Sequence, residues 1–123
     1  MTEAIVAVLE TNPGHLFFGS VAFKYQPEDV DPPEAARRAI ALGMIPTTSG
    51  PATGCAPPPE KLYRIRRGIG TGALALASGL TPGNAYELGR FLTHALVSTG
   101  ISESFYVFSE PLLARFLEQV QGD

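Results

Sequence analysis

The stretch Leu62-Tyr63-Arg64-Ile65-Arg66-Arg67-Gly68-Ile69-Gly70-Thr71-Gly72, with residues 73–80 after it, decides how the middle of this chain folds. It places three arginines and three glycines in nine consecutive positions, in a protein whose net charge is −3. Residues 61–66 predict a strand that leads into the glycines. The alternating alanine and leucine of residues 73–80 suit either a strand or a short helix, and that choice decides whether the glycine segment opens a helix.

This stretch is also the strongest candidate for a binding site. Glycine lets backbone N–H groups approach a ligand closely, and arginine supplies a fixed positive charge. The pattern therefore predicts a cradle for a phosphate-bearing ligand such as a nucleotide or coenzyme A. Its members are Arg64, Arg66, Arg67, Gly68, Gly70 and Gly72. The alternative, which we favour, is structural: the glycines let a strand bend beside another backbone, and the arginines are solvated or paired with acids.

Part of the stretch resembles a known cofactor-binding loop. Arg67-Gly68-Ile69-Gly70-Thr71-Gly72 is similar to the R-x-x-G-x-G loop of the acyl-CoA N-acetyltransferase family. The resemblance implies that backbone amides at the start of a helix hold the cofactor pyrophosphate, and it carries over to Arg67, Gly70 and Gly72 alone. The chain departs from that pattern because only two strands are predicted before the loop, and Gly79 with Pro82 interrupts the helix that should follow.

The N-terminal segment predicts a β-hairpin. Residues 4–9 are a short continuous apolar run, which is typical of a buried strand. Residues 11–14 have turn chemistry, with Pro13 followed by Gly14, and residues 15–25 alternate between apolar and other side chains. Two strands joined in this way predict an antiparallel pair.

Helix signals follow at three places. Asp31 is a predicted N-cap with Pro32 at the first helical position, and Gly43 ends that helix after Leu42. A second helix is predicted from Pro82 to the region of Gly100, and a last one after Ser109. Residues 105–108 predict a strand. The expected fold is a single compact α+β domain over residues 1–123, in the order ββαβ(β)αβα, with about three helices packed on a small sheet that starts with the hairpin.

Residues 46–60 form a predicted loop or arm that is rich in proline and glycine. Loops of this length without regular structure are uncommon in compact domains and are usually functional or disordered. We therefore expect this arm to pack on the domain itself or on a neighbouring chain.

Composition excludes several classes of protein. The net charge of −3 makes a nucleic-acid partner unlikely, although a local contact through the three arginines is a third, weaker option. Cys55 is the only cysteine, so the chain can form no internal disulfide and no multi-cysteine metal site. The long uncharged run of residues 68–86 is broken by glycines and Pro82, so no membrane span is predicted. We expect a cytoplasmic protein.

No convincing catalytic set is present. Glu87, Arg90 and His94 have helical spacing and could form an acid–base line, but the solvated face of a helix is the favoured interpretation. Cys55 has no predicted thiolate-stabilising partner, and the two histidines have no metal-ligand spacing. The sequence therefore predicts no catalytic residue, no metal ligand and no cofactor beyond the candidate anion cradle.

These observations favour a non-enzymatic structural or interaction module. Bulky aromatic residues point to both faces of predicted strands, as at Phe17 and Phe18, so a partner chain would be needed to cover one face. We expect self-association as a homo-oligomer or docking into a larger protein assembly, such as a virion or scaffold. The alternative is a nucleotide or coenzyme A binder, or an acyltransferase-like enzyme, that uses the cradle at residues 64–72.

Overall fold

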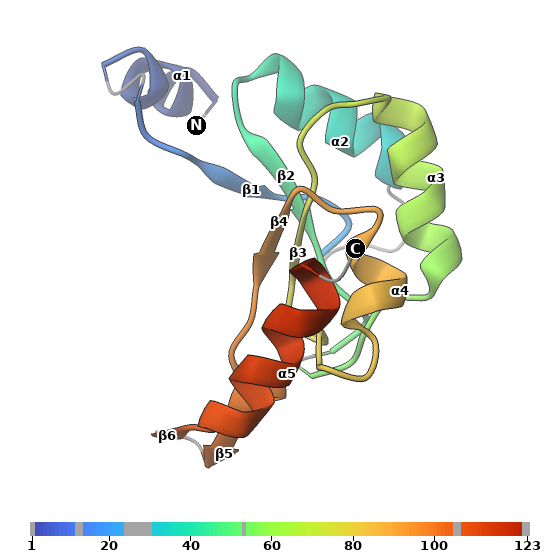
Figure 1. Ribbon diagram of the computed structural model, residues 1–123. Helices are drawn as coiled ribbons and strands as arrows, with labels where there is room; N and C mark the ends of the chain where they lie inside the picture. The colour runs from blue at the N-terminus through green and yellow to red at the C-terminus, as the bar shows by residue number, and fades with distance from the viewer. Residues whose placement is uncertain (1, 12–13, 24–30, 53, 105–106, 122–123) are drawn as a thin grey trace.

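The computed structural model shows helices that alternate with parallel strands (Figure 1). It describes residues 2–11, 14–23, 31–52, 54–104 and 107–121. Four strands form one sheet in the order β1-β2-β3-β4, and every neighbouring pair in it is parallel. They are β1 (Phe18–Ser20), β2 (Ile45–Thr48), β3 (Ala75–Ala77) and β4 (His94–Leu96).

Helices connect these strands, as parallel pairing requires. They are α2 (Pro32–Ala41), α3 (Pro59–Ile69) and α4 (Ala85–Gly89). The helix α1 (Thr2–Thr11) precedes the sheet. After β4 come the short 3-10 helix η1 (Thr99–Ile101), an antiparallel pair of β5 (Ser102–Ser104) with β6 (Val107–Phe108), and the helix α5 (Glu110–Gln121). The expected small domain of helices on a sheet is present, but its class is α/β with a mostly parallel sheet.

The predicted N-terminal hairpin is wrong. Residues 2–11 form α1, and β1 pairs in parallel with β2, Gly19 lying opposite Pro46. A short continuous apolar run does not distinguish a strand from a helix, and here the helix is formed. Residues 12, 13 and 24–30, which held part of the expected turn and the end of the second strand, lie outside the described residues.

The predicted helix after Asp31 is confirmed. The Asp31 carboxylate accepts a hydrogen bond from the backbone N–H of Glu34 at 3.3 Å, which satisfies one free donor of the first turn. Gly43, with φ of 86°, follows the helix end. The buried face of α2 is made of Ala36 and Ala39, whose small side chains let the helix lie close to the sheet.

The strand predicted at residues 61–66 is wrong, because this segment belongs to α3. Pro58 precedes the helix in extended conformation and Pro59 begins it. Leu62 and Ile65 are fully buried and share one face of the helix. Gly68 lies on this helix where a Cβ would come within 2.6 Å of the Pro33 Cβ, so its lack of a side chain lets α3 approach α2.

The second predicted helix is shorter than expected. It ends at Gly89, and the chain then turns so that the backbone N–H of Thr93 donates to the Leu74 carbonyl at 2.8 Å. His94 therefore begins β4, and the expected line of Glu87, Arg90 and His94 does not exist on one helix. Residues 75–77 are resolved as strand β3, which answers the ambiguity at residues 73–80. Of the strand predicted at residues 105–108, the first two lie outside the described residues and the last two form β6.

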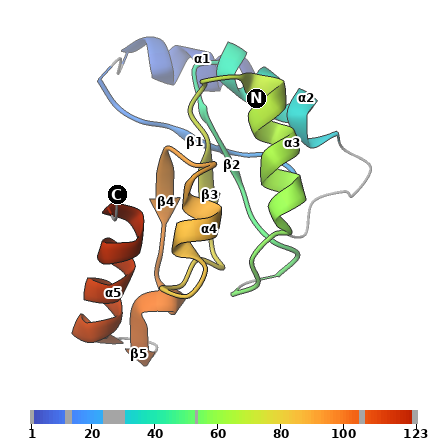
Figure 2. The ribbon, with the colours of Figure 1, turned by 45° about the vertical axis from the view of Figure 1, so that its right-hand side comes forward.

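The core lies between the sheet and the helices. Helices α2, α3, α4 and α5 cover one face of the sheet in chain order (Figures 1 and 2). One buried cluster joins α2 and α3 to residues that flank β1 and β3, and a second joins β3 to α3, α4 and α5. Their buried members are Val21, Ala36, Ala39, Ile65 and Leu74 in the first, and Leu62, Leu76, Leu80, Ala85, Leu88, Ile101 and Phe116 in the second. Phe116 is the one aromatic residue among these buried members.

The opposite face of the sheet is strongly curved. The rings of Phe18 on β1 and His94 on β4 meet edge to face, with centroids 5.7 Å apart. Three strand spacings would separate these two strands by about 14 Å in a flat sheet. The two outer strands therefore tilt toward each other, as in a segment of a barrel.

Candidate functional site

The carboxyl ends of the four parallel strands meet at one edge of the sheet. The chain runs downward along β2, β3 and β4 in Figure 1, so this edge lies at the bottom of the view. Four connections leave it, at residues 21–31, 49–58, 78–84 and 97–98. In open sheets of parallel strands, ligands bind outside this edge, and we call it the carboxyl edge.

Backbone strain is concentrated at the carboxyl edge. Among the described residues, Ala22 and Ser78 are the two non-glycine residues with positive φ, at 45° and 77°. Ala22 lies just after β1, and Ser78 follows β3 directly. Such conformations are unfavourable for residues with a Cβ, and they persist where the surrounding structure holds them, which is typical of functional sites.

Three glycines allow close backbone packing among the loops of this edge. A Cβ at Gly50 would overlap the Cys55 carbonyl, and one at Gly100 would overlap the Leu80 carbonyl. A Cβ at Gly79, where φ is 92°, would come within 2.6 Å of the Ala56 Cα. Gly79 and Gly100 therefore bring the loops after β2, β3 and β4 into direct backbone contact, which no larger residue at these two positions would permit, and Gly50 lets the loop after β2 fold back on itself.

Hydrogen bonds hold the loop after β3 in place. The Ser78 hydroxyl accepts from the Gly54 N–H at 2.7 Å, which ties this loop to the one after β2. The Asn84 side chain accepts from the Thr81 N–H at 2.8 Å and donates to the Gly79 carbonyl at 2.9 Å. The loop is thus fixed at both ends.

Backbone donors remain free at the same place. No described residue accepts a hydrogen bond from the N–H groups of Gly79, Leu80 or Gly100. Leu80 is only 2% exposed, and buried amides normally have a partner. Free amides in concave backbone bind anions, so the loops after β3 and β4 have the chemistry of an anion site.

A cation lies on the other side of the carboxyl edge. Lys61, in the first turn of α3, donates from Nζ to the carbonyls of Ala22 and Ser49, both at 2.7 Å. The buried hydroxyl of Thr48 also donates to the Ala22 carbonyl, at 3.3 Å. Partial burial lowers the pKa of the Lys61 ammonium.

The residues of the predicted anion cradle do not converge on this edge. Arg66 donates to the carbonyls of Gly70, Gly72 and Phe91, at distances between 2.6 and 3.1 Å. These groups lie at the end of α3 and before β3 and β4, which is the amino edge of the sheet. Arg66 therefore serves the local backbone, and anion binding by the cradle stays a prediction.

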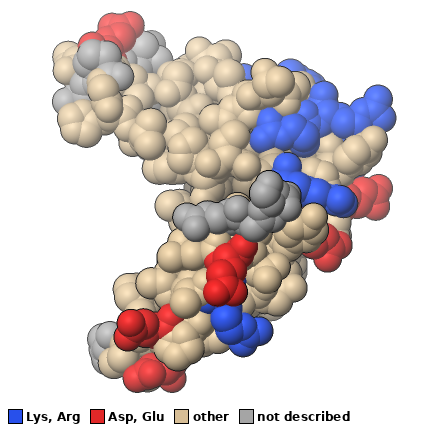
Figure 3. All heavy atoms as spheres, viewed as in Figure 1, with Lys and Arg blue, Asp and Glu red and all other residues tan. Residues whose placement is uncertain are grey.

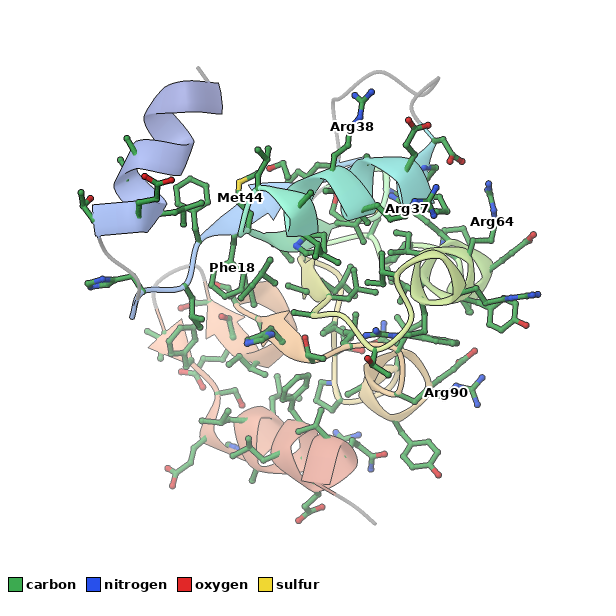
Figure 4. All side chains as sticks on the ribbon, turned by 90° about the horizontal axis from the view of Figure 1, so that it is seen from above. Phe18, Arg37, Arg38, Met44, Arg64 and Arg90 are labelled. Carbon is green, nitrogen blue, oxygen red and sulfur yellow. The ribbon has the colours of Figure 1, made fainter. Side chains whose placement is uncertain are left out.

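The other arginines point away from the sheet. Arg64 lies 3.5 Å from the Asp31 carboxylate, and Arg67 lies over the Tyr63 ring. Figure 4 shows Arg38, Arg64 and Arg90 directed outward, while Phe18 points toward the middle of the molecule. Lys and Arg side chains gather over α2 and α3 in Figure 3. This basic surface belongs to the outer faces of the helices.

The sequence also predicted no reactive cysteine, no metal site and no membrane span. Cys55 is exposed, in the loop after β2. Within the described ranges no group of three or more His, Cys, Asp or Glu residues is placed to hold a metal ion. In the same ranges no helix combines the length and the apolar character needed to cross a membrane.

The sequence pointed to charged residues, and the structure instead brings together backbone groups. The residues that sequence reasoning missed are Lys61, Ser78, Gly79 and Gly100. Gly79 precedes a run of turn residues up to Asn84, which was a usable signal for a shaped loop. Nothing in the sequence alone singles out Lys61. Its position becomes informative only when residues 59–69 are known to form a helix, because Lys61 then lies in the first turn of that helix at the carboxyl edge.

Three solved structures of isomerases resemble this chain. No protein-family model and no curated protein matches the chain. The chain resembles the structure of N-(5'-phosphoribosyl)anthranilate isomerase from Pyrococcus furiosus, with a TM-score of 0.62 and 17% identity over 100% of this chain and 58% of that chain. It resembles the phosphoribosyl anthranilate isomerase from Thermococcus kodakaraensis, with a TM-score of 0.61 and 27% identity over 96% of this chain and 58% of that one. The isomerase from Thermus thermophilus gives a TM-score of 0.50 and 20% identity over 98% of this chain and 80% of that one.

These comparisons correct the expected function. The solved structures matched along nearly the whole chain are enzymes, so the prediction of a non-enzymatic, self-associating structural module of a virion or scaffold is wrong. The nucleotide, coenzyme A or acyltransferase alternative is not matched either. The chain spans 58% of the length of the first two isomerases. Which protein partners it has stays a prediction.

Replacing Gly100 by alanine tests the close backbone packing of the loops. The new Cβ would overlap the Leu80 carbonyl, so we expect Gly100→Ala to lower the free energy of unfolding by about 1–3 kcal/mol. Gly83→Ala is the matched control, because its Cβ would meet nothing closer than Thr81 Oγ1 at 3.6 Å, and a change within about 0.5 kcal/mol is expected. Urea unfolding followed by circular dichroism measures both. Equal stabilities for the two variants would contradict the described contact.

Neutralising single arginines tests the role of the predicted cradle. Arg66→Met leaves three carbonyls without their donor, so we expect it to lower the free energy of unfolding by about 1.5–3 kcal/mol. Arg67→Met removes only the contact with the Tyr63 ring and should cost about 0.5–1 kcal/mol. The same urea experiment compares them. If Arg66→Met is no more destabilising than Arg67→Met, the Arg66 guanidinium is available for a ligand and the cradle gains support.

Proposed function

We propose that this chain forms the sugar-phosphate-binding part of an isomerase site that takes a phosphoribosyl compound, with the phosphate held between the loops after β3 and β4. The carboxyl edge supplies the binding groups. The substrate class is the one named for the solved isomerases that the chain resembles.

The observation that carries this proposal is the set of free backbone amides at Gly79, Leu80 and Gly100. They come from two adjacent loops that are in direct contact, so they can converge on one group of oxygens. A phosphate offers several acceptor oxygens, and fixed backbone N–H groups hold it without the entropy cost of ordering long side chains.

Two further findings support a phosphosugar over another anion. The isomerase from Thermococcus kodakaraensis is 27% identical over 96% of this chain, so the likeness extends beyond one loop. In barrels of alternating strands and helices, enzyme sites lie at the carboxyl ends of the strands, and phosphate groups are often held by loops of neighbouring strands there. The free amides occupy that position.

The groups at the edge are suited to binding rather than to the whole reaction. The described donors are amides, the Ser78 and Ser98 hydroxyls and the Lys61 ammonium. The chain spans 58% of the first two isomerases, so we assign substrate binding to it and expect further catalytic groups from outside these residues.

Two substitutions that add a negative charge, one at each edge of the sheet, test the proposal. Ser98 is exposed just after β4 at the carboxyl edge, and Thr71 is exposed before β3 at the amino edge. We expect isothermal titration calorimetry to show binding of ribose 5-phosphate but not of ribose. Ser98→Asp should weaken that binding by about tenfold, because an added carboxylate repels the phosphate at short range. Thr71→Asp adds the same charge and should leave the affinity unchanged.

Two results would count against the phosphate site. One is the absence of ribose 5-phosphate binding to the unmodified chain. The other is an equal loss of affinity in both variants, which would indicate a general charge effect in place of a local one. Thermal unfolding of each variant without ligand checks that the substitution itself leaves the fold intact.

A further inference from the structure

The loop after β2 meets the loop after β3 on both sides of Cys55. On one side, the Gly54 N–H donates to the Ser78 hydroxyl at 2.7 Å. On the other side, the Ala56 backbone lies so close to Gly79 that a Cβ there would come within 2.6 Å of the Ala56 Cα. Residues 78 and 79 are consecutive, so one short segment receives both contacts and a shift at one of them would disturb the other.

Ser78 has a backbone conformation that glycine would adopt at less cost. Its φ of 77° lies in the left-handed region, where a Cβ is crowded by the backbone. Such a conformation persists where the surrounding structure holds it. Within the described part of the chain, the hydrogen-bond partner of the Ser78 hydroxyl is the Gly54 N–H. The hydroxyl therefore supplies what a glycine at this position would lack, a tie to the loop after β2.

The conformation of Ser78 also directs the amides that follow it. Peptide groups are planar, so the two dihedral angles of a residue set the direction of the next N–H group. The next N–H groups are those of Gly79 and Leu80, which belong to the free donors of the proposed phosphate site. The Asn84 side chain holds this segment from within its own loop. Ser78 instead fixes it against a second loop.

The loop after β2 is itself compact. The Cys55 N–H donates to the Ala52 carbonyl at 3.0 Å, and Gly50 lies against the Cys55 carbonyl, so the loop is closed on itself. Three prolines within residues 51–58 restrict the backbone further. A closed loop with several prolines has few alternative conformations, so it can hold Ser78 in place.

We propose that Ser78 is a positioning residue that couples the loop after β2 to phosphate binding. When the Gly54 N–H is bonded to the Ser78 hydroxyl, the amides of Gly79 and Leu80 are directed at the phosphate. A phosphate bound to these amides stabilises the same hydrogen bond in return, because coupling between two sites is reciprocal. This inference rests on the proposed function. It adds that residues 49–58, which supply none of the proposed phosphate donors, regulate the affinity of the site.

Replacing Ser78 by glycine tests this coupling. Ser78→Gly removes the hydroxyl but suits the positive φ, so the fold should be kept. We expect isothermal titration calorimetry to show about fivefold weaker binding of ribose 5-phosphate, because one hydrogen bond between neutral groups no longer favours the binding arrangement. Ser104→Gly is the matched control, since it removes the same atoms from an exposed position on β5 and should leave the affinity unchanged.

A measurement on the hydrogen bond itself distinguishes positioning from a general loss of stability. In the unmodified chain, saturating ribose 5-phosphate should slow the hydrogen exchange of the Gly54 amide by about the same fivefold factor, and ribose should not. Nuclear magnetic resonance follows this exchange amide by amide. In Ser78→Gly the Gly54 amide has lost its acceptor, so its exchange should not respond to the ligand.

The outcomes separate this inference from the proposed function. If the unmodified chain does not bind ribose 5-phosphate, the phosphate site fails and the coupling fails with it. If the unmodified chain binds it, but Ser78→Gly binds it equally well, the coupling is wrong and the phosphate site stands. A Gly54 exchange rate that does not change on binding overturns the coupling in the same way. The exchange measurement needs no variant, so it decides the question even where Ser78→Gly does not fold.

Discussion

The close backbone contact between the loops after β2, β3 and β4 is the constraint on which the carboxyl edge depends. The contact exists because Gly79 and Gly100 have no Cβ. It brings the backbone of neighbouring loops together, and Ser78 in one of these loops has a positive φ of 77°. The carboxyl edge is therefore formed mainly by backbone groups, and hydrogen bonds of the Asn84 side chain and the Ser78 hydroxyl hold its loops in place. A site of this kind is preorganised, because few of its groups have to be ordered when a ligand binds.

The sequence predicted those elements whose signals are local. The helix α2 begins at Asp31 and is followed by Gly43, and Ser109 precedes α5, where its hydroxyl accepts from the Leu112 N–H. Caps of this type act within one turn, so a single sequence reveals them. The segments at residues 4–9 and 61–66 failed for the opposite reason. Their apolar patterns suit two structures, and packing against distant parts of the chain decided between them.

The parallel topology of the sheet could not be predicted from the sequence, for a related reason. Gly19 pairs with Pro46, and Thr47 with Ala75, so a whole helix separates each pair of partners in the chain. A hairpin has its signal in the turn itself, whereas a parallel pair has none. Once residues 59–69 are a helix and residues 94–96 a strand, the alternation of strand and helix becomes visible and the expected α+β hairpin fold gives way to α/β.

The candidate site could not be predicted from residue types. The arginines and glycines of residues 64–72 predicted an anion site there. In the structure, Arg66 of this segment donates to backbone carbonyls before β3. The free donors at Gly79, Leu80 and Gly100 are main-chain groups that every sequence contains. Only the fold shows which of them lack an acceptor, and only the fold places Lys61 at the ends of two strands.

The brevity of the outer strands has a consequence for solubility. β1 and β4 pair on one side only, and each is three residues long. An unpaired strand edge is a template for the addition of another chain, and long flat edges promote fibril growth. Three residues offer few free N–H and C=O groups in a row, and the strong curvature of this sheet misaligns them with a flat strand. Short outer strands in a curved sheet therefore disfavour the addition of another chain at β1 and β4.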